Sequence, residues 1–318
     1  MTGNRRQQYC NILESMTEIK TCYISIGCNR TPHSADWGHN GQICFGACNA
    51  VSIYQPEVEN KSAQILQTYV HHNNRVNCVT WIRRFPVSDG GDVGLVSGSV
   101  DTTAVVWKYV ETQLKPVATL TNHTGPVNGV AAICLQTSQN QSVGMTTYVA
   151  TSSADSTVNI WKQENDGDFN IIQTHKFGTG FCLDLSFTVI PNTEVPMLAC
   201  GCDDHKVHIF VEQSGKFVRM MSLPGHEDWI RAVDFTVDDL GDVVLASAAQ
   251  DYFIRIWRFS RRTTEDNIMK TVKELSIDEE IKMRENTFQF KIGDETAVYA
   301  VSLESVLSGH ENWIYSVK

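Results

Sequence analysis

The sequence predicts an all-β fold of the β-propeller class, and two repeated patterns carry that prediction. Four times, an aspartate is followed six residues later by an aromatic residue, with β-branched residues in between. The four pairs are Asp101 and Trp107, Asp155 and Trp161, Asp204 and Phe210, and Asp251 and Trp257. The aromatics stand 54, 49 and 47 residues apart, a period typical of proteins built from repeated units.

The second pattern is a histidine that runs in phase with the first. His72 precedes its aspartate by 29 residues, His123 by 32 and His226 by 25. Four residues after each histidine, a valine or isoleucine begins another apolar segment. Because side chains of a strand alternate between two faces, these segments read as short strands with bulk on both faces. Each repeat therefore predicts one blade of stacked strands.

A hydroxyl residue stands four positions before three of the acids, and the combination resembles the hydrogen-bonded tetrad of WD40 repeats. A buried carboxylate is costly unless donors surround it, and this tetrad supplies them. The resemblance predicts three tetrads: His72, Ser97, Asp101 and Trp107; His123, Thr151, Asp155 and Trp161; His226, Ser247, Asp251 and Trp257. In the remaining repeat, Cys200 and Phe210 replace the hydroxyl and the tryptophan, so we expect a degenerate blade.

The repeats divide residues 1–318 into about five blades of an N-terminal WD40-type propeller, plus the first strand of a sixth. We expect blades at residues 21–70, to 120, to 174, to 223, and from 230 onward. Propellers close with roughly four to eight blades, so this pattern predicts a chain cut in mid-repeat. A charged insert at 260–296 interrupts the fifth blade. Its apolar spacing suits a short helix, but we expect residues 261–282 to be mobile.

Composition limits the classes of partner. The net charge of −10 disfavours a broad surface for nucleic acid, because such binding depends on lysine and arginine neutralising phosphates. The chain has no apolar run long enough for a membrane helix and no apolar core of a signal peptide after Met1. We therefore expect a soluble protein in the cytoplasm, with the nucleus a second location, and expect its ten cysteines to be reduced.

The sequence predicts no catalytic, cofactor-binding or metal-binding residues. Six potential zinc ligands crowd one region, namely Cys22, Cys28, His33, His39, Cys44 and Cys48, but Cys22 and Cys44 fall inside apparent strands at 21–27 and 42–46 rather than on turns. His205 and His208 are three residues apart, and strand alternation would point them to opposite faces. Motifs of phosphate loops, zinc proteases and serine hydrolases do not occur. We expect a protein that is not an enzyme.

Several segments resemble the Elongator subunit 2 family of WD40-repeat proteins more closely than a generic repeat. They include residues 185–201, 225–231, 284–288 and 309–313, and the resemblance runs from about residue 76 to residue 318. It implies a scaffold with two successive propellers that joins the largest subunit of Elongator to its catalytic subunit, which modifies the wobble uridine of certain tRNAs. It also implies protein partners, no membrane, and no direct nucleic-acid contact as the main role.

Two other functions stay open at this point. A WD40 adaptor of another assembly, such as a ubiquitin-ligase substrate receptor, would share every repeat signal, and a subunit that contacts tRNA directly would differ in its charge. For partner binding, we consider the positions three and five residues after each of these histidines and after His310, because they open the inner strand on one rim. They are Arg75, Asn77, Asn128, Trp229, Arg231, Trp313 and Tyr315. Alternatively, Trp229 packs between neighbouring blades.

Overall fold

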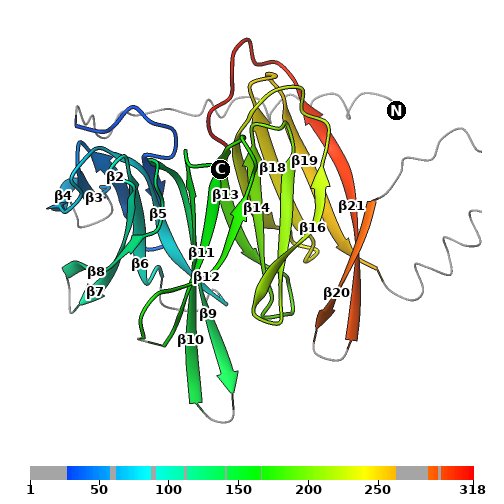
Figure 1. Cartoon of the computed structure of the whole chain (residues 1–318), viewed down its shortest axis with the longest axis horizontal. Helices are drawn as coiled ribbons and strands as arrows, with labels where there is room; N and C mark the ends of the chain where they lie inside the picture. The colour runs from blue at the N-terminus through cyan, green and yellow to red at the C-terminus, as the bar shows by residue number, and fades with distance from the viewer. Residues whose placement is uncertain are drawn as a thin grey trace, which may run out of the picture.

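The computed structural model describes residues 27–57, 62–86, 91–110, 113–139, 142–165, 167–262, 286–292 and 295–318. Over these residues the regular structure consists of β-strands, and no helix there is long and apolar enough to cross a membrane. The predicted all-β propeller is confirmed. Figure 1 shows the strands following one another in chain order, from the blue first blade to the red last strands.

Five antiparallel blades succeed one another. Blade 1 contains β1 (Ala35–Trp37), β2 (Ile43–Ala47), β3 (Ala50–Gln55) and β4 (Gln64–Val70). Blade 2 contains β5 (Val76–Phe85), β6 (Gly94–Ser99), β7 (Thr103–Val110) and β8 (Gln113–Thr121), and blade 3 contains β9 (Val127–Gln139), β10 (Ser142–Ser153), β11 (Thr157–Glu164) and β12 (Asn170–Lys176). Blade 4 contains β13 (Cys182–Val189), β14 (Pro196–Cys202), β15 (Val207–Gln213) and β16 (Lys216–Leu223). Blade 5 contains β17 (Ile230–Val237), β18 (Val243–Ala249), β19 (Ile254–Arg261), β21 (Glu295–Leu307) and β20 (Asn286–Ile292), in that spatial order.

The apolar core lies between blades rather than inside one of them. Each of the four large clusters of buried side chains combines residues from two successive blades. This is why strands such as β3, β6 and β14 are buried along their whole length, with no exposed face. A blade therefore gains its stability by stacking on its neighbours.

Blades 2 and 3 are joined more tightly than the others. The end of β5 pairs in parallel with β9, through Arg83 with Ile133, Arg84 with Cys134, and Phe85 with Leu135. The two blades thereby form one eight-stranded sheet, whereas blades 1, 4 and 5 are separate sheets.

The first blade differs in detail from the prediction. Its innermost described strand is β1, a segment that the sequence analysis did not identify as a strand, and residues 21–26 of the expected strand lie outside the described residues. The loop before β1 reaches across the propeller, because His33 Nε2 lies 3.0 Å from the Arg231 carbonyl oxygen. Blade 1 therefore contacts blade 5.

The insert of blade 5 also holds a strand that was not predicted. Residues 286–292 form β20, which pairs with β21 as a fifth strand. Its Phe288 and Phe290 stack against Tyr299 at centroid distances of 5.8 and 5.5 Å, inside the cluster between blades 4 and 5. The expected short helix and most of the segment expected to be mobile fall within residues 263–285, outside the described part of the chain.

Residues 309–318 lie beside β17 and β18 in the position expected for the first strand of a sixth blade. They have no β-ladder pairing, but Ile314 is buried against Ala232 and Ala248, and its amide donates to the Ala249 carbonyl at 3.3 Å. The segment therefore covers part of one face of blade 5.

Candidate functional site

The four members of each predicted tetrad lie together in blades 2, 3 and 5. In blade 2, His72 Nδ1 is 3.1 Å from Asp101 Oδ2, His72 Nε2 is 2.8 Å from Ser97 Oγ, and Trp107 Nε1 donates to that hydroxyl at 2.9 Å. The loop histidine is thereby connected to the turn aspartate and to two neighbouring strands.

The other two tetrads repeat this geometry closely. In blade 3 the corresponding distances are 3.0, 2.8 and 3.1 Å, among His123, Asp155, Thr151 and Trp161. In blade 5 they are 2.8, 2.8 and 3.0 Å, among His226, Asp251, Ser247 and Trp257. Both ring nitrogens of each histidine have a partner, so none of these three imidazoles offers a free nitrogen for proton transfer to a substrate.

Burial shifts the pKa values of the tetrad histidines in blades 2 and 5. It lowers the pKa of His72 and His226 below the usual histidine value, although the paired aspartates oppose this shift. Burial raises the pKa of Asp251, but the amide of Glu227 and the ring of His226 outweigh this by donating hydrogen bonds, so the net pKa lies below the usual range. In blades 2 and 5 these shifts favour a neutral histidine beside an ionised aspartate.

Blade 4 has the degenerate arrangement that its sequence predicted. Gly178 occupies the place of the loop histidine, four residues before β13, while Cys200 and Phe210 are buried in the other tetrad positions. The remaining acid, Asp204, accepts a hydrogen bond from His208 Nε2 at 3.0 Å. His208 lies four residues after the aspartate, where blade 5 has Arg255, which donates to Asp251 at 2.9 Å. The sequence analysis missed this recurring polar position.

The seven residues predicted for partner binding fall into two groups on the rim of the propeller. In the first group, Arg75 Nε donates to Asn77 Oδ1 at 3.2 Å, and Asn77 Nδ2 donates to Asn128 Oδ1 at 3.2 Å. Asn77 is only 5% exposed, and its amide also donates to the Val127 carbonyl at 3.0 Å. Asn77 therefore connects blades 2 and 3 and offers a partner little surface.

The second group, here named the aromatic–arginine cluster, consists of Trp229, Arg231, Trp313 and Tyr315. The Arg231 guanidinium lies over the Trp229 ring at 5.2 Å and over the Tyr315 ring at 5.8 Å, and Trp313 contacts Tyr315 at a centroid distance of 6.2 Å. The three rings are 39, 44 and 45% exposed, in the order Trp229, Trp313, Tyr315. The three rings of the cluster are therefore partly exposed in the part of the chain that the structure describes.

A rim hollow of about 250 Å³ connects the two groups. Arg75, Asn77, Asn128 and Arg231 line it together with His33 from the first blade. A hydrogen bond to Gln250 holds Arg231 in place. The Gln250 amide oxygen accepts from Arg231 Nε at 2.8 Å when the amide is in the orientation that satisfies its hydrogen bonds. Arg231 thus belongs both to the hollow and to the aromatic–arginine cluster.

The metal-ligand candidates of the first blade do not come together. Among the described residues, no three of these candidates bring their ligand atoms close together; they are Cys28, His33, His39, Cys44 and Cys48. Cys22 lies outside the described residues. The described part of the chain contains one group of three possible ligands elsewhere, made of Cys202, Asp204 and His208 in blade 4. The sequence analysis discounted His208 because it paired this histidine with His205, which lies in the turn at a positive φ of 65°.

The fold and the tetrads define a WD40-type β-propeller. The family described as "WD domain, G-beta repeat" matches residues 63–108, 114–162 and 217–258. The crystal structure of the WD40 β-propeller domain of Doa1 superposes with a TM-score of 0.51, covering 88% of this chain and 69% of that one. At 20% identity this likeness concerns the fold alone.

Within that class, the chain is homologous to Elongator complex protein 2, as its sequence segments predicted. It is 39% identical to the protein of that name from Danio rerio over 299 residues, 35% to that from Homo sapiens over 303, and 26% to that from Saccharomyces cerevisiae over 305. These alignments cover 93 to 94% of this chain, but only 33 to 35% of the relatives. The chain thus spans about a third of their length.

Proposed function

We propose that this chain is a non-catalytic scaffold subunit of an Elongator complex, and that it binds partner proteins through the aromatic–arginine cluster. Its partners would be the largest subunit and the catalytic subunit, and holding them together would support modification of the tRNA wobble uridine. The expected locations are the cytoplasm and the nucleus. The exposed cluster is the observation that carries the binding role, and the homology to Elongator complex protein 2 supports the choice of complex.

The cluster has the composition that protein interfaces favour. Tryptophan, tyrosine and arginine dominate binding hot spots, because they bury large areas and lose little conformational freedom. Here the guanidinium is already positioned by Gln250 and by two rings, so its side chain pays little entropy on binding. Trp229 and Arg231 are two residues apart on the chain, whereas Tyr315 arrives from a different segment. A partner would therefore recognise the packed arrangement of both segments.

The charge of the chain favours a protein partner over RNA as the main ligand. The formal net charge is −10, whereas strong non-specific RNA binding needs an excess of lysine and arginine that neutralises phosphates. The arginines of the rim, Arg75 and Arg231, are both engaged with neighbouring side chains. Direct capture of tRNA remains an outcome that the experiment distinguishes.

The test is co-purification of the full-length protein from cells, followed by identification of its partners. We expect Trp229→Ala combined with Arg231→Ala to reduce recovery of the largest and catalytic Elongator subunits at least about tenfold, which corresponds to the loss of one hot spot. Trp37→Ala is the matched control, since Trp37 is 63% exposed and lies on β1, outside the cluster.

Three results would refute the proposal. They are normal recovery of both subunits with the double variant, equal loss with Trp37→Ala, and recovery of a different assembly by the unaltered protein. Salt-dependent binding of tRNA that the double variant abolishes would instead identify the cluster as an RNA site.

A further inference from the structure

Blade 4 lacks the loop histidine that closes the tetrads of blades 2, 3 and 5, and a hollow lies against its turn between β14 and β15. Gly178 stands at the histidine position with a positive φ of 68°, and an added Cβ there would meet nothing within 4 Å. The hollow has a volume of about 340 Å³, and its lining includes Thr179, Gly180, Cys202 and Asp204. A small ligand therefore has access to the turn between β14 and β15.

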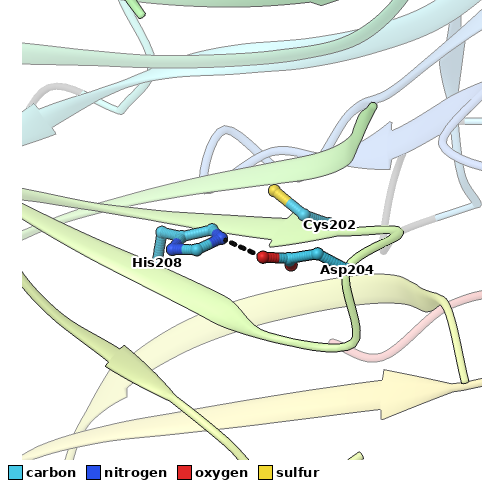
Figure 2. Close-up of side chains that lie close together, drawn as sticks. All are labelled: Cys202, Asp204 and His208. Carbon is cyan, nitrogen blue, oxygen red and sulfur yellow. Dashed lines mark hydrogen bonds and ion pairs between the residues drawn. The ribbon is translucent and has the colours of Figure 1, made fainter. Parts of the chain in front are cut away.

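Three side chains of different ligand types converge at this turn. Cys202 ends β14, Asp204 lies in the turn and His208 lies on β15. One thiol sulphur, one carboxylate oxygen and one ring nitrogen of these residues lie within 4.8 Å of one another. Figure 2 shows His208 joined to Asp204 by a hydrogen bond, with the Cys202 side chain close beside them.

We propose that Cys202, Asp204 and His208 bind a zinc ion. A thiolate, an imidazole and a carboxylate form a ligand set that suits Zn²⁺, and sites with three protein ligands keep a fourth position for water. From the usual Zn–S, Zn–N and Zn–O bond lengths, tetrahedral ligands are about 3.4 to 3.6 Å apart. The three ligand atoms lie within 4.8 Å of one another, and the nitrogen and the carboxylate oxygen are 3.0 Å apart, so movements of about 1 Å would bring them to this spacing. Two of the three ligands, Cys202 and Asp204, line the hollow.

The surroundings of His208 orient it for this role. Its second ring nitrogen, Nδ1, lies 2.8 Å from Ser222 Oγ on β16, so Nε2 is the nitrogen directed at Asp204. A ligating histidine is usually held through its other nitrogen in this way. Cys202 and His208 are buried at 1 and 4% exposure, whereas the Asp204 side chain is 45% exposed. Two ligands are therefore fixed, and the third is open to an arriving ion.

The other blades lack this combination. At the place of Cys202, blades 2 and 3 have Ser99 and Ser153, whose hydroxyls accept the amide hydrogen of the turn aspartate at 3.1 Å. At the place of His208 they have Val105 and Asn159. Blade 4 alone combines a thiol, an acid and an imidazole at its turn. The ion would thus add to the hydrogen bonds of His208 and of the Lys206 amide at a turn that has no tetrad histidine.

The experiment measures metal binding by the purified protein. We expect one equivalent of Zn²⁺ to remain after dialysis, and Co²⁺ in its place to give the thiolate-to-metal charge-transfer absorption of a cysteine ligand. Cys202→Ala should abolish this absorption. Ser222→Ala, which removes only the hydroxyl behind His208, should weaken Zn²⁺ binding by about 10- to 100-fold in a chelator competition.

Controls separate a metal site from general effects on folding. Cys134→Ala removes another buried cysteine, in blade 3, and should leave both metal content and absorption unchanged. Asp204→Asn keeps the shape of an exposed side chain, so it should fold normally and still weaken binding. The proposal fails if Co²⁺ gives no thiolate absorption in the unaltered protein, if that absorption survives Cys202→Ala, or if Cys134→Ala removes it. In each of these cases His208 serves only as a hydrogen-bond donor to Asp204.

Discussion

Among the four turn aspartates, Asp251 is the one whose removal should cost the most stability. Its side chain is 4% exposed and accepts hydrogen bonds from His226 Nδ1 at 2.8 Å, Arg255 Nη1 at 2.9 Å, and the amides of Glu227 and Phe253 at 3.1 Å. Asp251→Ala would leave the largely buried Arg255 guanidinium without its anion. Removing one member of a buried ion pair costs about 3 to 5 kcal/mol.

Thermal unfolding followed by circular dichroism checks this value. At about 2 to 4 °C per kcal/mol for a domain of this kind, Tm should fall by about 6 to 20 °C. Asp204→Ala provides the comparison, because that carboxylate is 45% exposed and pairs with a histidine rather than an arginine. We expect it to cost only about 1 kcal/mol in the absence of metal.

A second substitution tests the reason for the loss. If the unpaired charge causes it, Asp251→Ala combined with Arg255→Leu should be more stable than Asp251→Ala alone, because apolar replacement of a whole buried pair costs little. The reasoning is refuted if Asp204→Ala lowers Tm as much as Asp251→Ala, or if the double variant melts no later than the single one.

Three further predictions concern the same networks. The folded-state pKa values of His72 and His226 lie below their unfolded value of about 6.5. Their contribution to stability is therefore complete above that pH and is lost as the pH falls through the folded pKa values. Tm should decrease between pH 7.5 and 5, and a constant Tm would contradict this. A double-mutant cycle of Trp107→Phe and Ser97→Ala, measured by urea unfolding, should give a coupling of about 0.5 to 1.5 kcal/mol from their 2.9 Å hydrogen bond, and strict additivity would argue against it. Gly225→Ala should destabilise the protein by about 1 to 3 kcal/mol, since Gly225 has a φ of 138°, and unchanged urea unfolding would show that the backbone relaxes there.

The sequence was most informative for the tetrad residues that lie within one hairpin. Ser97 and Trp107 lie on adjacent strands of such a hairpin, on either side of Asp101, so their spacing along the chain follows directly from local β geometry. The loop histidine comes from farther away, but it precedes a strand whose apolar start marks its place. Local geometry and repetition together made the tetrad residues recognisable.

Packing between distant segments could not be predicted in this way. Trp229 and Arg231 both lie where β17 begins. Tyr315 joins them only because residues 309–318 lie against blade 5. Strand β20 was not predicted because its alternating residues Phe288 and Phe290 follow a highly charged stretch. Their burial also depends on blade 4 as well as blade 5. His208 was missed because a strand-alternation argument was extended into a turn, where it does not apply.

The parallel pairing of β5 with β9 determines which blades separate from each other during local unfolding of the propeller. Elsewhere in the described residues each sheet belongs to one blade, and neighbouring blades share single hydrogen bonds, such as that from the Val79 amide to the His33 carbonyl, rather than a continuous ladder. At Arg83–Phe85 and Ile133–Leu135 the sheet runs on from one blade into the other. The smallest cooperative unit there should span both blades. Backbone amides of β5 and β9 near this junction should consequently exchange with deuterium at a common slow rate, while the boundary between blades 4 and 5 opens independently.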